Sequence, residues 1–166
     1  MRITTVTVAA ALTLVSLSTS LQGQRPDDQI DPRSMQLVAQ ARAARAAGNL
    51  EGATDLLETA ATVDPRNRAA FLLLAQVAET RDLPGKAIRL YREALLLEPN
   101  DTVALRGQGE ALVKKGAVAR ARDNLAKIRT LCKGTCPDAT QLAGAIAKGP
   151  PITTAATIPP KASGNP

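Results

Sequence analysis

The feature that most constrains the fold of this chain is a pattern that recurs every 34 residues. The sequence DPRN at 64–67 is followed 34 residues later by EPND at 98–101. Other positions share this spacing and carry related residues: Ala53, Ala87 and Ala121; Leu57, Tyr91 and Leu125; Ala60, Ala94 and Ile128; Leu37, Phe71 and Leu105; Ala41, Ala75 and Gly109. A period of this length is typical of solenoids, in which each repeat buries its apolar face against its neighbours.

The composition favours helices and argues against chemistry. Of the 166 residues 45% are apolar, yet Phe71 and Tyr91 are the only aromatic residues. Ala and Leu must therefore form most of the core, which suits closely packed helices better than a sheet. The chain contains no His, the commonest general base and metal ligand. We therefore expect an all-α protein that is not an enzyme, with no catalytic residue, metal or cofactor.

The repeated columns resemble the tetratricopeptide repeat (TPR), and the resemblance covers about residues 34–133. The second repeat matches this family best, because Phe71 and Tyr91 fall where the family prefers aromatic residues. The resemblance implies three helix-turn-helix repeats at about 34–67, 68–101 and 102–133, stacked as a short right-handed solenoid. Three departures are Gln40 and Gln108 in place of the usual Leu, and Lys133 in place of the exit Pro.

Small residues and helix-end signals agree with this arrangement. Two antiparallel helices approach closely only where small side chains face each other, as the Ala columns allow. Asn67 and Asp101 precede the first helices of repeats two and three, where we expect them to cap free amides. Pro84 suits the first turn of a helix, and Gly48 and Gly116 fall in turns. The start of the first repeat stays uncertain by one residue.

The two ends of the chain differ in composition from the repeats. Residues 1–23 carry one charge, Arg2, and then an uncharged run, which predicts an export signal cleaved near 20–23. The alternative is that this segment is not cleaved and anchors the protein in the membrane. No later segment is apolar for long enough to cross a bilayer, so we expect no stable membrane insertion after cleavage. Residues 24–33 form a predicted linker. Residues 149–166, rich in Pro, Thr and Ala, are a predicted disordered tail.

A capping helix is predicted at 137–147, with Ala139, Leu142, Ala143 and Ile146 on one face, which closes a TPR domain spanning 34–148. The connection before it contains Cys132 and Cys136. Export implies an oxidising compartment, so a structural disulfide is the expected state of this pair. A redox-active dithiol is the rival interpretation, but the spacing is not Cys-x-x-Cys. Metal binding would need further ligands.

The TPR resemblance also implies a binding groove lined by the first helix of each repeat. The implied lining positions are Met35, Val38, Arg42, Arg45 and Ala46; Ala69, Leu72, Gln76, Glu79 and Thr80; and Val103, Arg106, Glu110, Val113 and Lys114. The candidate peptide contacts among them are Val38, Arg42, Arg45, Leu72, Gln76, Arg106, Glu110 and Lys114. Such a groove suits a peptide with apolar anchors and acidic groups, although exposed surface arginines are the plainer interpretation.

Charge separates the two halves of the expected mature chain. Residues 22–101 hold ten basic and twelve acidic residues (net −2), and residues 102–166 hold ten basic and three acidic (net +7). The first hypothesis is a non-enzymatic protein-protein interaction module, periplasmic or secreted, that binds a protein or peptide partner in the groove. The alternatives are a structural subunit of a cell-envelope assembly, contacting partners through the basic third repeat, and, remotely, a thiol-redox protein. We do not expect nucleic-acid binding. The sequence leaves the partner and the oligomeric state open.

Overall fold

The structure is a computed structural model that describes residues 29–151. The described chain is all-helical. Its helices are α1 (Pro32–Ala46), α2 (Leu50–Val63), α3 (Arg68–Thr80), α4 (Pro84–Leu97), α5 (Thr102–Lys114), α6 (Val118–Leu131) and α7 (Pro137–Lys148). The predicted leader, half of the predicted linker and most of the predicted tail lie outside the described residues.

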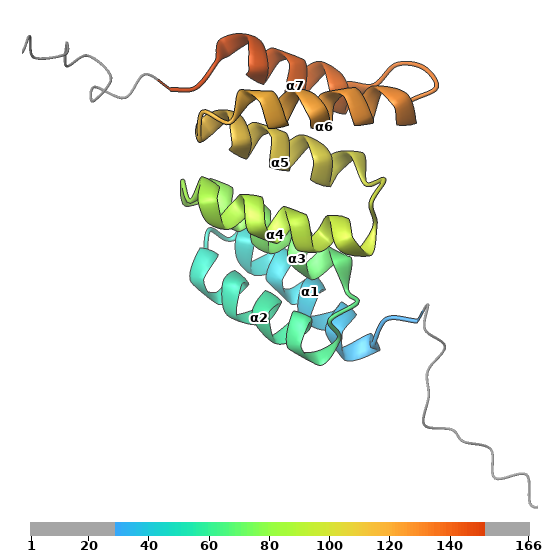
Figure 1. The fold of residues 1–166 in the computed structure, drawn as a ribbon. Coiled ribbons are helices and arrows are strands. Elements are labelled where there is room, and N and C mark those ends of the chain that lie inside the picture. Colours follow the sequence, from blue (N-terminus) through green and yellow to red (C-terminus); the bar gives the residue numbers. More distant parts are fainter. Residues whose placement is uncertain (1–28, 152–166) are drawn as a thin grey trace, which may run out of the picture.

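The helices form three hairpins that stack along one axis, as the repeat spacing predicts. Figure 1 shows α1 and α2 at one end of the stack, α3 and α4 and then α5 and α6 above them, and α7 at the other end. The helix α1 begins at Pro32 rather than at 34, because the side chain of Asp31 caps it by accepting a hydrogen bond from the Arg33 amide at 2.7 Å. The predicted all-α fold of three helical hairpins and a capping helix is confirmed.

Alanine columns hold the two helices of each hairpin close together. Ala53, Ala87 and Ala121 are fully buried in the second helices of the three hairpins, and Ala60 and Ala94 are fully buried one column further on. A methyl side chain at such a position lets the neighbouring backbone approach, so the core consists of closely packed helices rather than large interlocking side chains. Tyr91, at 2% exposure, is the largest fully buried side chain of the described residues.

A polar pair near the start of the odd-numbered helices joins each hairpin to the next unit of the stack. The first member is the third residue of α1 or the first residue of α3 or α5. The second member directly precedes α3 or α5, or is the second residue of α7. The pairs are Ser34 with Asn67 (Oγ to Nδ2, 2.8 Å), Arg68 with Asp101 (an ion pair) and Thr102 with Asp138 (Oγ1 to Oδ2, 2.6 Å). The third pair joins α5 to α7, and α7 packs against both helices of the third hairpin.

One of the two predicted helix caps is wrong. Asp101 caps α5 by accepting hydrogen bonds from the amides of Val103 (2.9 Å) and Ala104 (3.0 Å). Asn67 makes no such bond to α3. Its side chain is buried between two hairpins and donates instead to the Ser34 hydroxyl at 2.8 Å, which is buried with it.

The turn inside each hairpin places one residue in the left-handed region, and the three positions are 34 residues apart. Gly48 has φ 79° and Gly116 has φ 76°, whereas the middle turn uses Asp82 at φ 53°. Glycine adopts this conformation without steric cost, but an aspartate side chain raises its energy. The middle turn is therefore less favourable locally than the other two.

Replacing Asp82 by glycine is expected to raise the free energy of unfolding by about 0.5–1 kcal/mol, because it relieves this backbone conformation. The reciprocal change, Gly116→Asp, is expected to lower it by about 1 kcal/mol. Urea unfolding followed by circular dichroism measures both. An unchanged or lower value for Asp82→Gly would mean that polar contacts of the aspartate, such as Lys114 Nζ at 3.5 Å, outweigh the conformational gain.

Candidate functional site

A polar hollow lies where the first helices of the three hairpins meet. Its volume is about 300 Å³. We call it the central hollow and define it by its lining residues, which come from α1, α3, α4 and α5: Arg45, Gln76, Glu79, Thr80, Tyr91 and Arg106. Because all three repeats contribute to it, the hollow exists only when the hairpins are stacked.

The first side of the hollow is a guanidinium held by an amide. Arg45, in the last turn of α1, donates from Nη1 to the Oε1 atom of Gln76 at 2.7 Å. Gln76 stands near the middle of α3, so this bond crosses from the first hairpin to the second. A neutral amide fixes the direction of the guanidinium but leaves its charge uncompensated.

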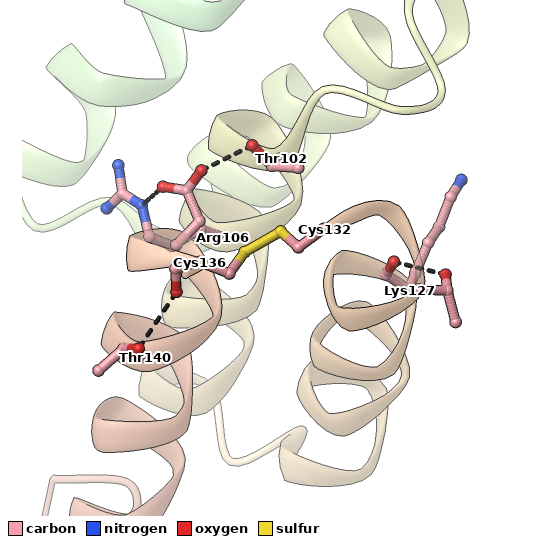
Figure 2. Close-up of a disulfide and its surroundings, with 8 residues drawn as sticks. Thr102, Arg106, Lys127, Cys132, Cys136 and Thr140 are labelled. Carbon is pink, nitrogen blue, oxygen red and sulfur yellow. Dashed lines mark hydrogen bonds and ion pairs between the residues drawn. A yellow bond between two sulfur atoms is a disulfide. The ribbon is translucent and has the colours of Figure 1, made fainter. Parts of the chain in front are cut away.

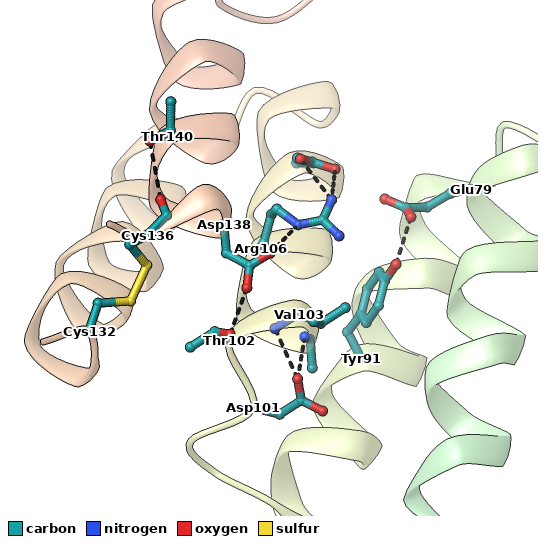
Figure 3. Close-up of polar contacts among 12 residues, drawn as sticks. Glu79, Tyr91, Asp101, Thr102, Val103, Arg106, Cys132, Cys136, Asp138 and Thr140 are labelled. Atoms are coloured by element: carbon teal, nitrogen blue, oxygen red, sulfur yellow. Dashed lines mark hydrogen bonds and ion pairs between the residues drawn. A yellow bond between two sulfur atoms is a disulfide. The ribbon is translucent and has the colours of Figure 1, made fainter. Parts of the chain in front are cut away.

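The floor of the hollow is a tyrosine bonded to a carboxylate (Figure 3). The Tyr91 hydroxyl of α4 donates to Glu79 Oε2 at 2.6 Å. Burial raises the pKa of Glu79; the Tyr91 hydroxyl partly opposes this rise, and the charge of Glu110 adds to it. Burial and the bond to Glu79 also raise the pKa of Tyr91, so the hydroxyl keeps its proton. Glu79 is thus a half-buried carboxylate in surroundings that disfavour its charge.

The opposite side is an arginine held by two carboxylates. Arg106 of α5 donates from Nε to Asp138 Oδ1 at 2.9 Å and from Nη1 to Glu110 Oε1 at 3.3 Å. Burial alone would lower the pKa of Arg106, but Glu110 and Asp138 raise it. Asp138 also accepts the Thr102 hydroxyl, so it is fixed between two groups of α5. The charge of Arg106 is therefore already compensated.

Three of the eight candidate contacts line the hollow, and a fourth is bonded to one of them. Arg45, Gln76 and Arg106 line the hollow, and Glu110 reaches it through Arg106. Lys114 is not part of the lining: it pairs with Asp82 at 3.5 Å, although its charge also acts on Glu79. Leu72 packs half-buried against the core, and Arg42 is exposed outside the lining.

The prediction that Val38 lines the groove is wrong. Val38 is 4% exposed and packs in the core with Ala41, Leu57 and Leu74. It lies three residues before Ala41 on the same face of α1, and that face turns inward against α2 and α3. The lining consequently lacks the apolar anchor position that the sequence suggested in the first repeat.

The sequence reasoning missed two contributors to the site. Asp138 belongs to α7, which was expected only to cover the end of the stack. Thr102 and Asp138 are 36 residues apart, whereas the equivalent Ser34 and Asn67 are 33 apart. The repeat period therefore does not place Asp138 in the same column as Asn67. Tyr91 was expected only in the core, yet its hydroxyl reaches the hollow.

Two cysteines join the last hairpin to α7 (Figure 2). Cys132 follows α6 and Cys136 precedes α7; the structure bonds their sulfur atoms, with the Cα atoms 6.0 Å apart. Both side chains pack partly buried against the cluster formed by Leu105, Leu125, Ile128, Ala139 and Leu142. The connection fixes the start of α7, and with it Asp138, two residues beyond Cys136.

The outer surface of the third hairpin is basic. Arg120, Arg122, Lys127 and Arg129 of α6 are exposed, and within residues 29–151 none of them takes part in an ion pair. In the same part of the chain, no helix has both the length and the apolar character needed to cross a bilayer.

No protein-family model matches the sequence, and no curated protein does. Solved structures do match the fold. The Sgt2 TPR domain from Aspergillus fumigatus is 19% identical, with a TM-score of 0.66 over 75% of this chain and 83% of that one.

Two further matches contain bound peptides. The second TPR of Spaghetti (RPAP3), bound to the HSP90 peptide SRMEEVD, is 16% identical, with a TM-score of 0.59 over 61% of this chain and 94% of that one. The Yersinia enterocolitica type III secretion chaperone SycD, in complex with a peptide of the translocator YopD, is 20% identical, with a TM-score of 0.60 over 69% and 86%. The chain has the fold of tetratricopeptide repeat domains.

Proposed function

We infer that this protein is a non-enzymatic binding module that takes a peptide segment of a partner protein in the central hollow. The observation that carries this proposal is the hollow itself: half-buried charged and hydrogen-bonding side chains from all three hairpins converge on one open space. The size of about 300 Å³ suits a few side chains of a peptide rather than a folded domain. The peptides bound by two proteins of the same fold agree with it.

Site-specific crosslinking tests which surface binds. We would place a photo-crosslinking amino acid at Thr80, which lines the hollow, or at Arg89, which is exposed on α4 outside it. A partner captured from Thr80 but not from Arg89 is the expected result. Arg45→Glu should then weaken the capture from Thr80 by about tenfold or more, because it reverses the charge of the lining. Equal capture from both positions would contradict the proposal.

The second candidate is a structural subunit that contacts a larger assembly through the basic face of α6. The exposed, unpaired cations of that face favour it, because such a surface attracts acidic partners. The same experiment with the crosslinker at Arg122 separates the two functions. Capture from Arg122 that persists in Arg45→Glu would assign binding to α6 and leave the hollow without a role.

Export and the disulfide belong to the same proposal. The uncharged run after Arg2 supports export to the periplasm, and a mature protein that begins near residues 20–24 would establish it. In an oxidising compartment Cys132 and Cys136 are expected to stay bonded and to hold α7 in place. A count of two freely alkylated thiols in protein purified from the cell envelope would instead revive the thiol-redox alternative.

A further inference from the structure

The charges of the central hollow are not equally available to a ligand. Arg106 is compensated by Glu110 and Asp138, and Lys114 is turned toward Asp82. Arg45 is bonded only to the neutral amide of Gln76, and Glu79 is bonded only to the neutral hydroxyl of Tyr91. Within residues 29–151, neither Arg45 nor Glu79 takes part in an ion pair. Among these described residues the hollow therefore presents one cation and one anion that are not in ion-pair contact; the charges of Lys114 and Arg106 act on Glu79 without such contact.

The fold keeps these two charges from compensating each other. Gln76 and Glu79 are three residues apart on α3 and so lie on one face of that helix. Gln76 holds the guanidinium of Arg45 at 2.7 Å, while the buried Tyr91 holds the carboxylate of Glu79 at 2.6 Å. Each charge is fixed by a neutral hydrogen-bonding partner that also directs it at the hollow. Such prepositioned charges are suited to an external ion because little side-chain ordering remains to be done on binding.

The surroundings of Glu79 favour a cationic ligand group over water. Burial is the largest cause of the raised pKa of Glu79 and the charge of Glu110 adds to it, while the Tyr91 hydroxyl and the charges of Lys114 and Arg106 oppose the rise only in part. A lysine or arginine side chain placed beside Glu79 would restore the lost stabilisation through a charge-assisted hydrogen bond in a partly desolvated site. An acidic group at the same place would be repelled by both Glu79 and Glu110.

We propose that the central hollow selects peptides with one basic and one acidic side chain, the basic one against Glu79 and the acidic one against Arg45. This inference rests on the proposed function and specifies the chemistry of its ligand. It differs from the acidic peptide suggested by the sequence, because the carboxylates of Glu110 and Asp138 remove Arg106 from the set of available cations. The pairing also gives the bound peptide a defined direction.

A random peptide library displayed on phage and selected against the full protein tests this inference. The wild-type protein and the variants Glu79→Gln and Arg45→Gln are each used for selection. Wild-type selection is expected to enrich peptides that carry a basic and an acidic residue at a fixed spacing. Selection on Glu79→Gln should lose the basic preference only, and selection on Arg45→Gln the acidic preference only.

Affinity measurements on one selected peptide make the assignment quantitative. Changing its basic residue to methionine should weaken binding about tenfold on the wild type and less than about twofold on Glu79→Gln, which is the signature of a direct pair. The control variants Glu51→Gln on α2 and Arg89→Gln on α4 make the same charge changes at exposed positions and should leave binding unchanged. Circular dichroism confirms that every variant is folded.

Each failure has a separate meaning. If peptides bind and crosslink to Thr80 but respond to neither Glu79→Gln nor Arg45→Gln, the charge assignment is overturned and the proposed function stands. If both variants lose the same preference, the pairing of charges is wrong. If no peptide is enriched on the wild type, the proposed function falls and this inference falls with it.

Discussion

Replacing Tyr91 by alanine is expected to lower the free energy of unfolding by about 3–5 kcal/mol, the range for deleting a buried aromatic side chain. Tyr91 is 2% exposed, and the other buried residues in its cluster are all alanines: Ala75, Ala78, Ala87, Ala94, Ala104 and Ala111. Larger side chains pack around this cluster but are only partly buried: Phe71, Leu72, Ile88, Leu90 and Leu95. Methyl groups fixed to helix backbones cannot move to fill the space. The cost within that range then depends on how far the partly buried side chains around the cluster close over the space.

Removing the Tyr91 ring should also weaken the contact between the second and third hairpins, because the ring touches α5 as well as its own hairpin. Small domains are stable by about 5–15 kcal/mol in total, so this variant would unfold readily or lose its third repeat first. Urea unfolding followed by circular dichroism at 222 nm measures the effect through the midpoint and the slope. A loss below about 1.5 kcal/mol would mean that the alanine helices close over the gap.

Tyr91→Phe is the matched control, because it keeps the ring and removes only the hydroxyl. It deletes the 2.6 Å hydrogen bond to Glu79, and we expect a loss of about 1 kcal/mol. The difference between the two variants separates the packing contribution of the ring from its polar role. In the peptide selection above, Tyr91→Phe should also relax the basic preference, because Glu79 is no longer held toward the hollow.

The fold was predictable because its determinants repeat along the chain. Ala53, Ala87 and Ala121 each mark the same close contact between two helices, so the assignment of one hairpin is supported by the other two. Two of the three turns carried glycine, and the proline at position 84 marked the first turn of α4. A periodic pattern with small residues at fixed intervals is consistent with few other architectures.

The site was less predictable because its geometry depends on contacts that do not repeat. Val38 and Asn67 were assigned by analogy with their column, but local packing turned Val38 into the core and Asn67 toward Ser34. The compensation of Arg106 depends on Asp138, which lies beyond an irregular connection between α6 and α7. Charge alone could not show which cation would remain available, since that depends on which carboxylates the fold brings within reach.

The second large effect is expected for Gly107→Ala. This change should lower the free energy of unfolding, whereas replacing a glycine in a helix by alanine ordinarily raises it. Gly107 is buried in α5, and an added Cβ atom would overlap the Cζ and Oη atoms of Tyr91 and lie 2.8 Å from its Cε1 atom. Alanine in a helix interior is normally more stable than glycine by about 1 kcal/mol. Here we expect Gly107→Ala to lower the free energy of unfolding by about 1–3 kcal/mol, because the ring is enclosed and hydrogen-bonded and cannot yield. Gly144→Ala is the matched control, since no neighbouring atom lies within 4 Å of its added Cβ atom.

The combination of Gly107→Ala with Tyr91→Ala identifies the cause. If the clash with the ring destabilises Gly107→Ala, the same change should stabilise the protein by up to about 1 kcal/mol once the ring is gone, as in Gly144→Ala. The two losses would then combine to less than their sum, and the shortfall measures the contact between the second and third hairpins. Additive losses would instead place the cost of Gly107→Ala elsewhere in α5. Because the same ring holds Glu79, a weakened contact should also reduce peptide binding, which would link the stacking of the repeats directly to the shape of the hollow.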